Sequence, residues 1–239
     1  MLMLEAVVIR QDGFEMQADF GVEAGARVAV IGPSGAGKST LLNAIAGFLD
    51  LAEGRVLWDG DEICGKRPGE RPIAMLFQDN NLFPHLSVEQ NAGLGIDPGM
   101  QLNVAQKEQV LQAIARVGLE GLEARKPGQL SGGQQSRAAL ARVLVQRKPL
   151  MLLDEPFAAL GPALKDEMLD LVGELASESG ATVLMVSHDP RDAERFADQA
   201  VMVAEGRAEA PVPVAELLAD PPETLRAYLG ASRSTVPGG

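Results

Sequence analysis

The sequence predicts an α/β fold with a mostly parallel central sheet, and two observations support this prediction. Short apolar runs without polar alternation occur at Val28 to Ile31, Leu150 to Leu153 and Thr182 to Val186. Strands that are buried on both faces of a parallel sheet have this composition. Polar residues follow directly after each run. Because ligands bind beyond the carboxyl ends of parallel strands, the three polar clusters predict one shared site.

Composition narrows the class of protein. With 239 residues, 46% of them hydrophobic, the chain can bury a core without disulfides or metals. The net charge of −12 and the aromatic content of 4% argue against nucleic acid as a partner. Cys64 is the only cysteine, which indicates a reducing compartment.

The sequence shows no segment that would enter a membrane by itself. Met1 to Arg10 lacks the pattern of a signal peptide, and no run approaches the roughly 18 apolar residues of a membrane span. We therefore expect any work at a membrane to go through a partner protein.

The remaining elements are predicted from turn residues and helical periodicity. Met1 to Ala26 is expected to form short edge strands, with turns at Asp12-Gly13 and Ala24-Gly25. Helices are predicted at Lys38 to Ala46, Val104 to Val117, Gly132 to Leu144 and Pro162 to Ala176.

The stretch from Asp79 to Gln129 lacks strong strand signals, which predicts a mostly helical subdomain over about residues 79–140. We expect it as an insertion in one domain of residues 1–230. The small, polar residues 231–239 are predicted to be a disordered tail.

A phosphate-binding loop is predicted between the first buried strand and the first helix. The pattern G-x-x-x-x-G-K-[ST] is matched, with Thr40 next, by Gly32-Pro33-Ser34-Gly35-Ala36-Gly37-Lys38-Ser39. The glycines let backbone N–H groups surround phosphate oxygens, Lys38 adds a charge for the β and γ phosphates, and Ser39 can hold Mg²⁺. A chance match occurs in on the order of 1 in 100 chains of this length. The strand before the loop and the helix after it favour ATP binding over chance.

The second buried run ends in two carboxylates, Asp154 and Glu155. Alone, such a pair is most often a solvated turn. Beside a phosphate loop, Asp154 is expected to hold Mg²⁺ through water, and Glu155 to act as general base on the attacking water.

A third motif, Leu130-Ser131-Gly132-Gly133-Gln134, precedes a predicted helix and is called the signature segment below. Ser131 and Gln134 predict a capping box, and a helix N-terminus with small residues can also bind an anion. On these motifs the chain resembles the ATPase subunits of ABC transporters over nearly its whole length. The resemblance implies a P-loop NTPase fold of the ABC type, with an N-terminal antiparallel β subdomain and an inserted helical subdomain.

The resemblance also implies a head-to-tail homodimer that holds two ATP molecules. Each ATP would lie between the phosphate loop of one subunit and residues Ser131, Gly132, Gly133 and Gln134 of the other. ATP binding would close the dimer, and hydrolysis would reopen it to drive a membrane permease.

Further single residues match family positions. By resemblance, Gln78 contacts Mg²⁺ or the attacking water, and His188 binds the γ-phosphate and positions the water next to Glu155. Ala158 to Leu160 matches the loop that crosses the dimer. Taken alone, Gln78 would more often be a surface residue and His188 a structural hydrogen-bonding residue.

Two positions depart from the family pattern. Gly161 stands where an aspartate usually ends the cross-dimer loop, which bears on the coupling of the two sites and on the rate of hydrolysis. The usual adenine-stacking aromatic has no clear match. Gln11 occupies its place, and the nearest substitute, Phe14, would either stack on adenine or pack in the core.

The segment from Asn80 to Leu86, called the docking loop below, lies where importers of this family receive a helix of the integral membrane permease. A periplasmic solute-binding protein would be an indirect partner through that permease. Leu82 and Phe83 would contact the permease helix, or else pack within their own subdomain.

Met75 to Phe83 and Gly32 to Gly47 look very like the corresponding segments in ATPases of bacterial thiamine importers. This resemblance implies import of thiamine or its phosphates, and a peripheral location at the cytoplasmic face of the bacterial inner membrane. The alternatives are a motor for another small solute, a soluble ABC ATPase that acts on DNA or ribosomes, and a near-inactive regulatory ATPase.

Overall fold

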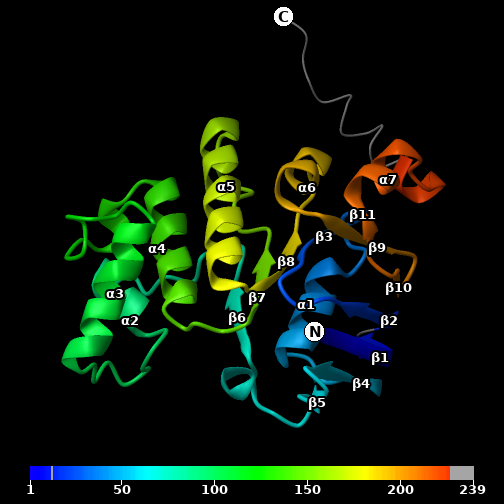
Figure 1. Ribbon diagram of the computed structural model, residues 1–239, viewed down its shortest axis with the longest axis horizontal. Helices are drawn as coiled ribbons and strands as arrows, with labels where there is room; N and C mark the ends of the chain where they lie inside the picture. Colours follow the sequence, from blue (N-terminus) through cyan, green and yellow to red (C-terminus); the bar gives the residue numbers. More distant parts are fainter. Residues whose placement is uncertain (12, 227–239) are drawn as a thin grey trace, which may run out of the picture.

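The computed structural model describes residues 1–11 and 13–226, and its strands form one sheet with a parallel and an antiparallel half (Figure 1). The parallel half contains, in order across the sheet, β6 (Ile73–Leu76), β7 (Leu150–Asp154), β8 (Thr182–Val186), β3 (Arg27–Ile31) and β9 (Gln199–Ala204). The antiparallel half contains β2 (Phe14–Val22), β1 (Leu2–Gln11), β4 (Glu53–Trp58) and β5 (Asp61–Glu62). Two short strands, β10 (Arg207–Ala208) and β11 (Val212–Pro213), pair with β9.

The predicted α/β class with a mostly parallel central sheet is confirmed. The three apolar runs form β3, β7 and β8, which are parallel neighbours, and every residue of β7 and β8 is buried. The side chains of β7 point alternately into two hydrophobic cores, one on each face of the sheet. Leu150 and Leu152 pack with α1 (Lys38–Ala46) and the antiparallel strands, whereas Met151 and Leu153 pack with the helices on the other face. A strand with a core on both faces has no polar side, which explains its uniform composition.

Met1 to Ala26 forms antiparallel strands, but the prediction that they are short edge strands is wrong. Strands β1 and β2 have 10 and 9 residues, and each is hydrogen-bonded to a strand on both sides. The second neighbour of β1 is β4, which lies more than 40 residues further along the chain, so the local sequence does not reveal it. Strand β9 was not predicted, although its run from Ala200 to Val203 is fully buried beside β3.

The predicted helices are confirmed, with small differences at their ends. They are α1, α3 (Val104–Arg116), α4 (Gly132–Leu144) and α5 (Pro162–Ser179). Helix α5 runs past Ala176 because the first residue that can end it in a left-handed conformation is Gly180, at φ 66°. The short helices α2 (Val88–Gly93), α6 (Pro190–Phe196) and α7 (Val214–Ala219) were not predicted individually. Among residues 1–11 and 13–226, none of these helices has the length and apolar character needed to cross a membrane.

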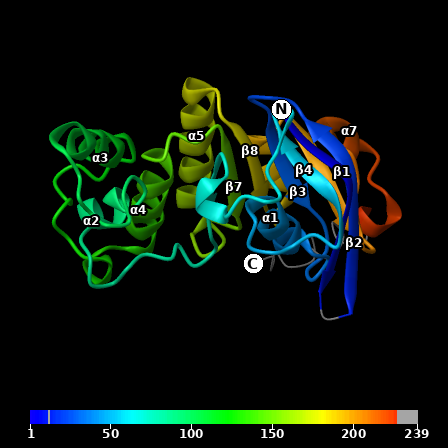
Figure 2. The ribbon, with the colours of Figure 1, turned by 90° about the horizontal axis from the view of Figure 1, so that it is seen from below.

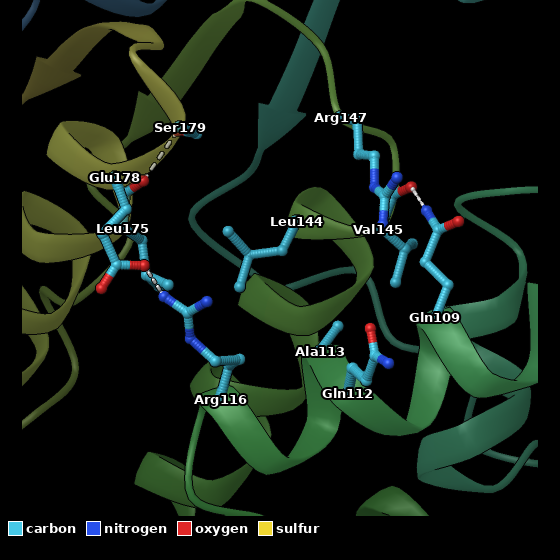
Figure 3. Close-up of a pocket in the computed structure, with 10 residues that line it drawn as sticks. All are labelled: Gln109, Gln112, Ala113, Arg116, Leu144, Val145, Arg147, Leu175, Glu178 and Ser179. Atoms are coloured by element: carbon cyan, nitrogen blue, oxygen red, sulfur yellow. Dashed lines mark hydrogen bonds and ion pairs between the residues drawn. The ribbon is translucent and has the colours of Figure 1, made fainter.

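Helices α2, α3 and α4 lie together at one end of the molecule, and α5 lies between them and the rest of the sheet (Figures 1 and 2). Ion pairs join this helical unit to α5: Arg116 of α3 with Glu178, and Arg137 of α4 with Glu167. A cavity of about 250 Å³ remains where α3, α4 and α5 meet, with Arg116 and Glu178 on its wall (Figure 3). The domain limits at residues 79–140 and 1–230 stay a prediction, and the predicted tail 231–239 lies outside the described residues.

Candidate functional site

The phosphate loop connects β3 to α1, and glycine is required at both of its ends. At Gly32 a Cβ atom would lie 1.9 Å from the carbonyl oxygen of Val203. At Gly37, where φ is 100°, it would lie 2.3 Å from the side chain of Met16 and 2.6 Å from the ring of Phe14. Gly35 has φ 76° and open space around it. The loop therefore packs tightly against the sheet at its ends, while its middle stays open for a ligand.

Lys38 closes this loop from inside. Its ammonium group donates to the carbonyl oxygens of Gly32 and Pro33, both at 2.9 Å, and only 7% of the residue is exposed. Burial lowers the pKa of Lys38, and the nearby carboxylates of Glu155 and Asp154 oppose this effect. A buried ammonium group held by neutral carbonyl oxygens is a strong partner for phosphate anions.

Ser39 and Asp154 meet beside the loop. The Ser39 hydroxyl donates to Asp154 Oδ1 at 2.8 Å, and Asp154 is only 8% exposed. Burial raises the pKa of Asp154, while the bond from Ser39 lowers it and the charge of Glu155 raises it further. A hydroxyl and a buried carboxylate next to a phosphate site are the donor set that Mg²⁺ uses in nucleotide enzymes. The residues present therefore fit a magnesium ion.

Glu155 and His188 lie at the ends of neighbouring strands. Glu155 follows β7 and His188 follows β8, and His188 Nδ1 is 3.4 Å from Glu155 Oε2. Glu155 has φ 45°, a left-handed conformation that is unusual for a non-glycine residue and is concentrated at functional sites. The three strand ends thus converge as the sequence predicted, with Lys38, Asp154, Glu155 and His188 on one edge of the sheet.

Two further predicted residues lie near this edge. Gln78 is exposed and follows β6 by two residues, next to β7, because Leu76 pairs with Leu153. Phe14 opens β2, is half-buried, and has its ring against Gly37 at the end of the phosphate loop. Phe14 therefore packs against one core, as one of the two predictions has it, and also borders the phosphate loop, whereas its stacking on adenine stays a prediction.

The signature segment lies elsewhere in the molecule. Ser131 caps α4 as predicted: its Oγ accepts from Gln134 N at 3.3 Å, and Gln134 Oε1 accepts from Ser131 N at 2.9 Å. Ser131 and Gly132 are exposed, and α4 lies with α2 and α3 away from α1 in both views (Figures 1 and 2). One chain therefore does not bring Ser131, Gly132, Gly133 and Gln134 to its own phosphate loop.

A polar network that the sequence analysis missed supports the segment after β8. Lys165 of α5 forms ion pairs with Asp192 at 2.8 Å and with Asp189 at 3.2 Å. Ser187 Oγ accepts from Asp189 N at 3.1 Å and donates to Asp192. These bonds brace the residues on both sides of His188. The polar run after β8 was a signal for such a network, but nothing in it identifies Lys165, more than 20 residues earlier.

Comparison with known proteins identifies the family to which the chain belongs. The family model described as ABC transporter matches residues 16–158, more than half of the chain. The chain belongs to the ABC transporter family as an ATP-binding subunit, and it is an ATPase.

Two relatives are similar to this chain over their whole length. The thiamine import ATP-binding protein ThiQ of Ruegeria sp. (strain TM1040) is 64% identical over 231 residues, which covers 97% of this chain and 100% of that protein. The protein of the same name from Cereibacter sphaeroides is 61% identical over 230 residues, with coverage of 96% and 100%.

Solved structures agree with the fold. An ATP-binding cassette of an ABC transporter in its ADP conformation has a TM-score of 0.86 and 28% identity, with coverage of 96% of this chain and 98% of that one. A dimeric post-hydrolysis cassette bound to ADP and Pi has a TM-score of 0.77 and 28% identity, with coverage of 90% and 99%.

Proposed function

We propose that this chain is the ATP-hydrolysing motor of a bacterial importer for thiamine or its phosphates. One observation supports the assignment as an ATP-hydrolysing motor. Lys38, the Ser39–Asp154 pair and the Glu155–His188 pair converge at the ends of adjacent strands. The names of the relatives at 64% and 61% identity support thiamine as the solute.

ATP binds with its phosphates in the loop from Gly32 to Ser39, followed by Thr40 at the start of α1. Lys38 exchanges the carbonyl oxygens of Gly32 and Pro33 for oxygens of the β and γ phosphates. Ser39, Asp154 and Gln78 would hold Mg²⁺, and the ion would neutralise charge on the phosphates. Phe14 stacks on the adenine, an assignment supported by the contact of its ring with Gly37.

Glu155 and His188 carry out the hydrolytic step. The oxygen of a water molecule attacks the γ-phosphorus, and the Glu155 carboxylate takes the proton of that water. The bond between the γ-phosphorus and the β–γ bridging oxygen breaks, and ADP leaves with the electron pair. His188, 3.4 Å from Glu155, orients the water and the γ-phosphate. The network of Lys165 and Asp192 behind the strand end keeps this segment in place.

A second copy of the chain completes the site. Ser131, Gly132, Gly133 and Gln134 lie at the start of α4, which lies with α2 and α3 away from α1, and Ser131 and Gly132 are exposed (Figures 1 and 2). In a head-to-tail homodimer they reach the γ-phosphate held by the partner subunit. Because ATP then contacts both subunits, ATP binding closes the dimer and hydrolysis reopens it.

The permease binds at the docking loop from Asn80 to Leu86. Phe83 is 47% exposed and Phe48 is 55% exposed, and both line a groove of about 310 Å³ together with Met75 and Phe77. Exposed aromatic side chains around a groove suit an amphipathic helix as partner. The motor is thus held peripherally at the cytoplasmic face of the inner membrane, and the periplasmic solute-binding protein contacts only the permease.

Uptake of labelled thiamine at limiting concentration tests this proposal in cells that lack any second thiamine importer. Deletion of the gene should abolish uptake, and the wild-type chain, but not Glu155→Gln, should restore it. Unchanged uptake after deletion would rule out thiamine as the solute. Equal restoration by Glu155→Gln would rule out the motor.

A further inference from the structure

Two consecutive residues of the docking loop have an unusual backbone conformation. Asn80 and Asn81 have φ values of 56° and 46°, both in the left-handed region. Asparagine tolerates this region better than most residues, but two in succession require external support. Their carbonyl oxygens both accept hydrogen bonds from the guanidinium of Arg142, from Nη2 to Asn80 and from Nη1 to Asn81, each at 2.7 Å.

The guanidinium of Arg142 donates its hydrogen bonds to these two carbonyl groups. Its side chain is half-buried, and burial lowers its pKa. Within residues 1–11 and 13–226, no acidic side chain forms an ion pair with it. A planar guanidinium donates two parallel bonds from fixed positions, which lysine cannot reproduce. Arg142 therefore holds the carbonyl groups of both left-handed residues in place.

Arg142 also connects two functional regions of the chain. It lies on α4, the helix that begins at the signature segment, and Ser136 of the same helix accepts a bond from Asn80 Nδ2 at 3.3 Å. On the far side of the loop, Asn91 of α2 is 1% exposed and binds Phe83 through both its amide oxygen, at 2.8 Å, and its amide nitrogen, at 3.1 Å. Between Asn80 and Phe83, the loop is thus fixed to α4 at one end and to α2 at the other.

We propose that Arg142 is a positioning residue that couples the signature end of α4 to the docking loop. When ATP draws Ser131 and Gly132 toward the partner subunit, α4 carries the carbonyl groups of Asn80 and Asn81 with it and re-orients Phe83. The inference rests on the proposed ATP-driven dimer. In this role Arg142 transmits the movement of the signature segment to the docking loop, in addition to stabilising the loop.

Amide hydrogen exchange over residues 81–86 tests this role in the full chain without the permease. All variants carry Glu155→Gln, which lets ATP bind without turnover, and size exclusion monitors the dimer. The chain with Glu155→Gln alone is the parent. In this parent, Mg-ATP should slow amide exchange in the docking loop by roughly tenfold, which is about the effect of one charged hydrogen bond. Arg142→Gln should bind ATP and dimerise but lose this response. Arg142→Lys keeps the positive charge but cannot donate two parallel bonds, and it should lose at least half of the response to Mg-ATP.

Arg137→Gln is the matched control. Arg137 lies on the same helix and also donates to a backbone carbonyl, that of Val117 at 2.8 Å, but it faces α3 and α5. It should keep the full response. A full response in Arg142→Gln, or an equal loss in both glutamine variants, would overturn the inference. If Arg142→Gln does not fold, a full response in Arg142→Lys overturns it instead.

The outcome separates this inference from the proposed function. If the Glu155→Gln chain does not dimerise with ATP, the ATP-driven dimer is contradicted, and the role of Arg142 with it. If it dimerises but its docking loop does not respond, only the coupling through Arg142 is contradicted. A parent that responds together with an Arg142→Gln variant that responds equally contradicts only the role of Arg142.

Discussion

The Ser39 hydroxyl donates a hydrogen bond to Asp154 Oδ1 at 2.8 Å, which joins the first turn of α1 to the end of β7. The two residues are 115 positions apart in the chain. Without nucleotide, this bond is the main compensation for a carboxylate whose charge is disfavoured by burial. Burial of this carboxylate therefore carries a cost in stability, and under the proposed function we expect Mg-ATP to offset it.

Asp154→Asn should raise the thermal midpoint of the nucleotide-free chain and remove the stabilisation by Mg-ATP. Burial raises the pKa of Asp154 in the folded state. The stability that belongs to the protonated carboxyl is fully present below the unfolded pKa of about 3.9 and is lost as pH rises through the folded pKa. The advantage of asparagine should therefore grow from about pH 4 toward neutral pH. Thermal melts across this range, with exposed Asp61→Asn as the control, check the prediction. A constant advantage at every pH would contradict it.

Glu155→Gln should lower the rate of ATP hydrolysis by about 100-fold or more, because the amide cannot accept the proton of the attacking water. ATP binding should be retained, since Glu155 is not a ligand of the phosphates. Phosphate release under saturating Mg-ATP measures the rate, and size exclusion should show an accumulated dimer. A wild-type chain that turns over no faster than this variant would indicate a regulatory, near-inactive subunit.

Gly161→Asp should be tolerated and should tighten the coupling of the two sites. Gly161 is the N-cap of α5, with φ −66° and open space where a Cβ would lie. An aspartate there can cap the helix, which should raise the free energy of unfolding by a few tenths of a kcal/mol, roughly 0.3. Gly161→Asn supplies the cap without the charge and is the control. Greater cooperativity of hydrolysis with ATP concentration in the aspartate variant alone is the expected result, and identical curves would show that Gly161 does not limit coupling.

Phe14→Ala should weaken ATP binding by about tenfold, which corresponds to the loss of one aromatic stack on a base. Phe14→Trp should keep the affinity, because it preserves a stacking face. Titration with a fluorescent ATP analogue measures both variants. Since Phe14 is half-buried against the core, the competing outcome is a lower thermal midpoint with unchanged affinity, which would make Phe14 a packing residue only.

Arg71→Ala should lower the free energy of unfolding by roughly 2–4 kcal/mol. Arg71 is 5% exposed, and its guanidinium donates to the carbonyl oxygens of Ala44 and Ile45 at the end of α1, and to those of Cys64 and Lys66. These carbonyl groups lose their donor in the variant. The control is Arg67→Ala, an exposed residue paired with Glu70, which should change stability by less than about 0.5 kcal/mol. Equal effects in urea denaturation would contradict the assigned role.

Much of the site could be predicted from the sequence because its chemistry lies in contiguous segments. The loop from Gly32 to Ser39 needs its glycines and its lysine in fixed order, since backbone N–H groups and one charge must surround the same phosphates. The buried strands could be predicted because a core on both faces permits only apolar residues. Asp154 and Glu155 were identified for the same reason, as the first polar residues after such a strand.

The tertiary structure alone decided the contacts between distant segments. No local pattern identifies β4 as the second neighbour of β1, Lys165 as the support of Asp189, or Arg142 as the clamp on Asn80 and Asn81. These contacts depend on how the helices pack on the sheet. A long polar side chain reaches its partner only because the packing of other residues places the two segments side by side. The amino-acid sequence by itself determined the parallel core, the phosphate loop and the acidic strand end. Only the folded chain decided that the signature segment lies apart from its own phosphate loop, because the rigid helix that carries it packs with α2 and α3 rather than with α1.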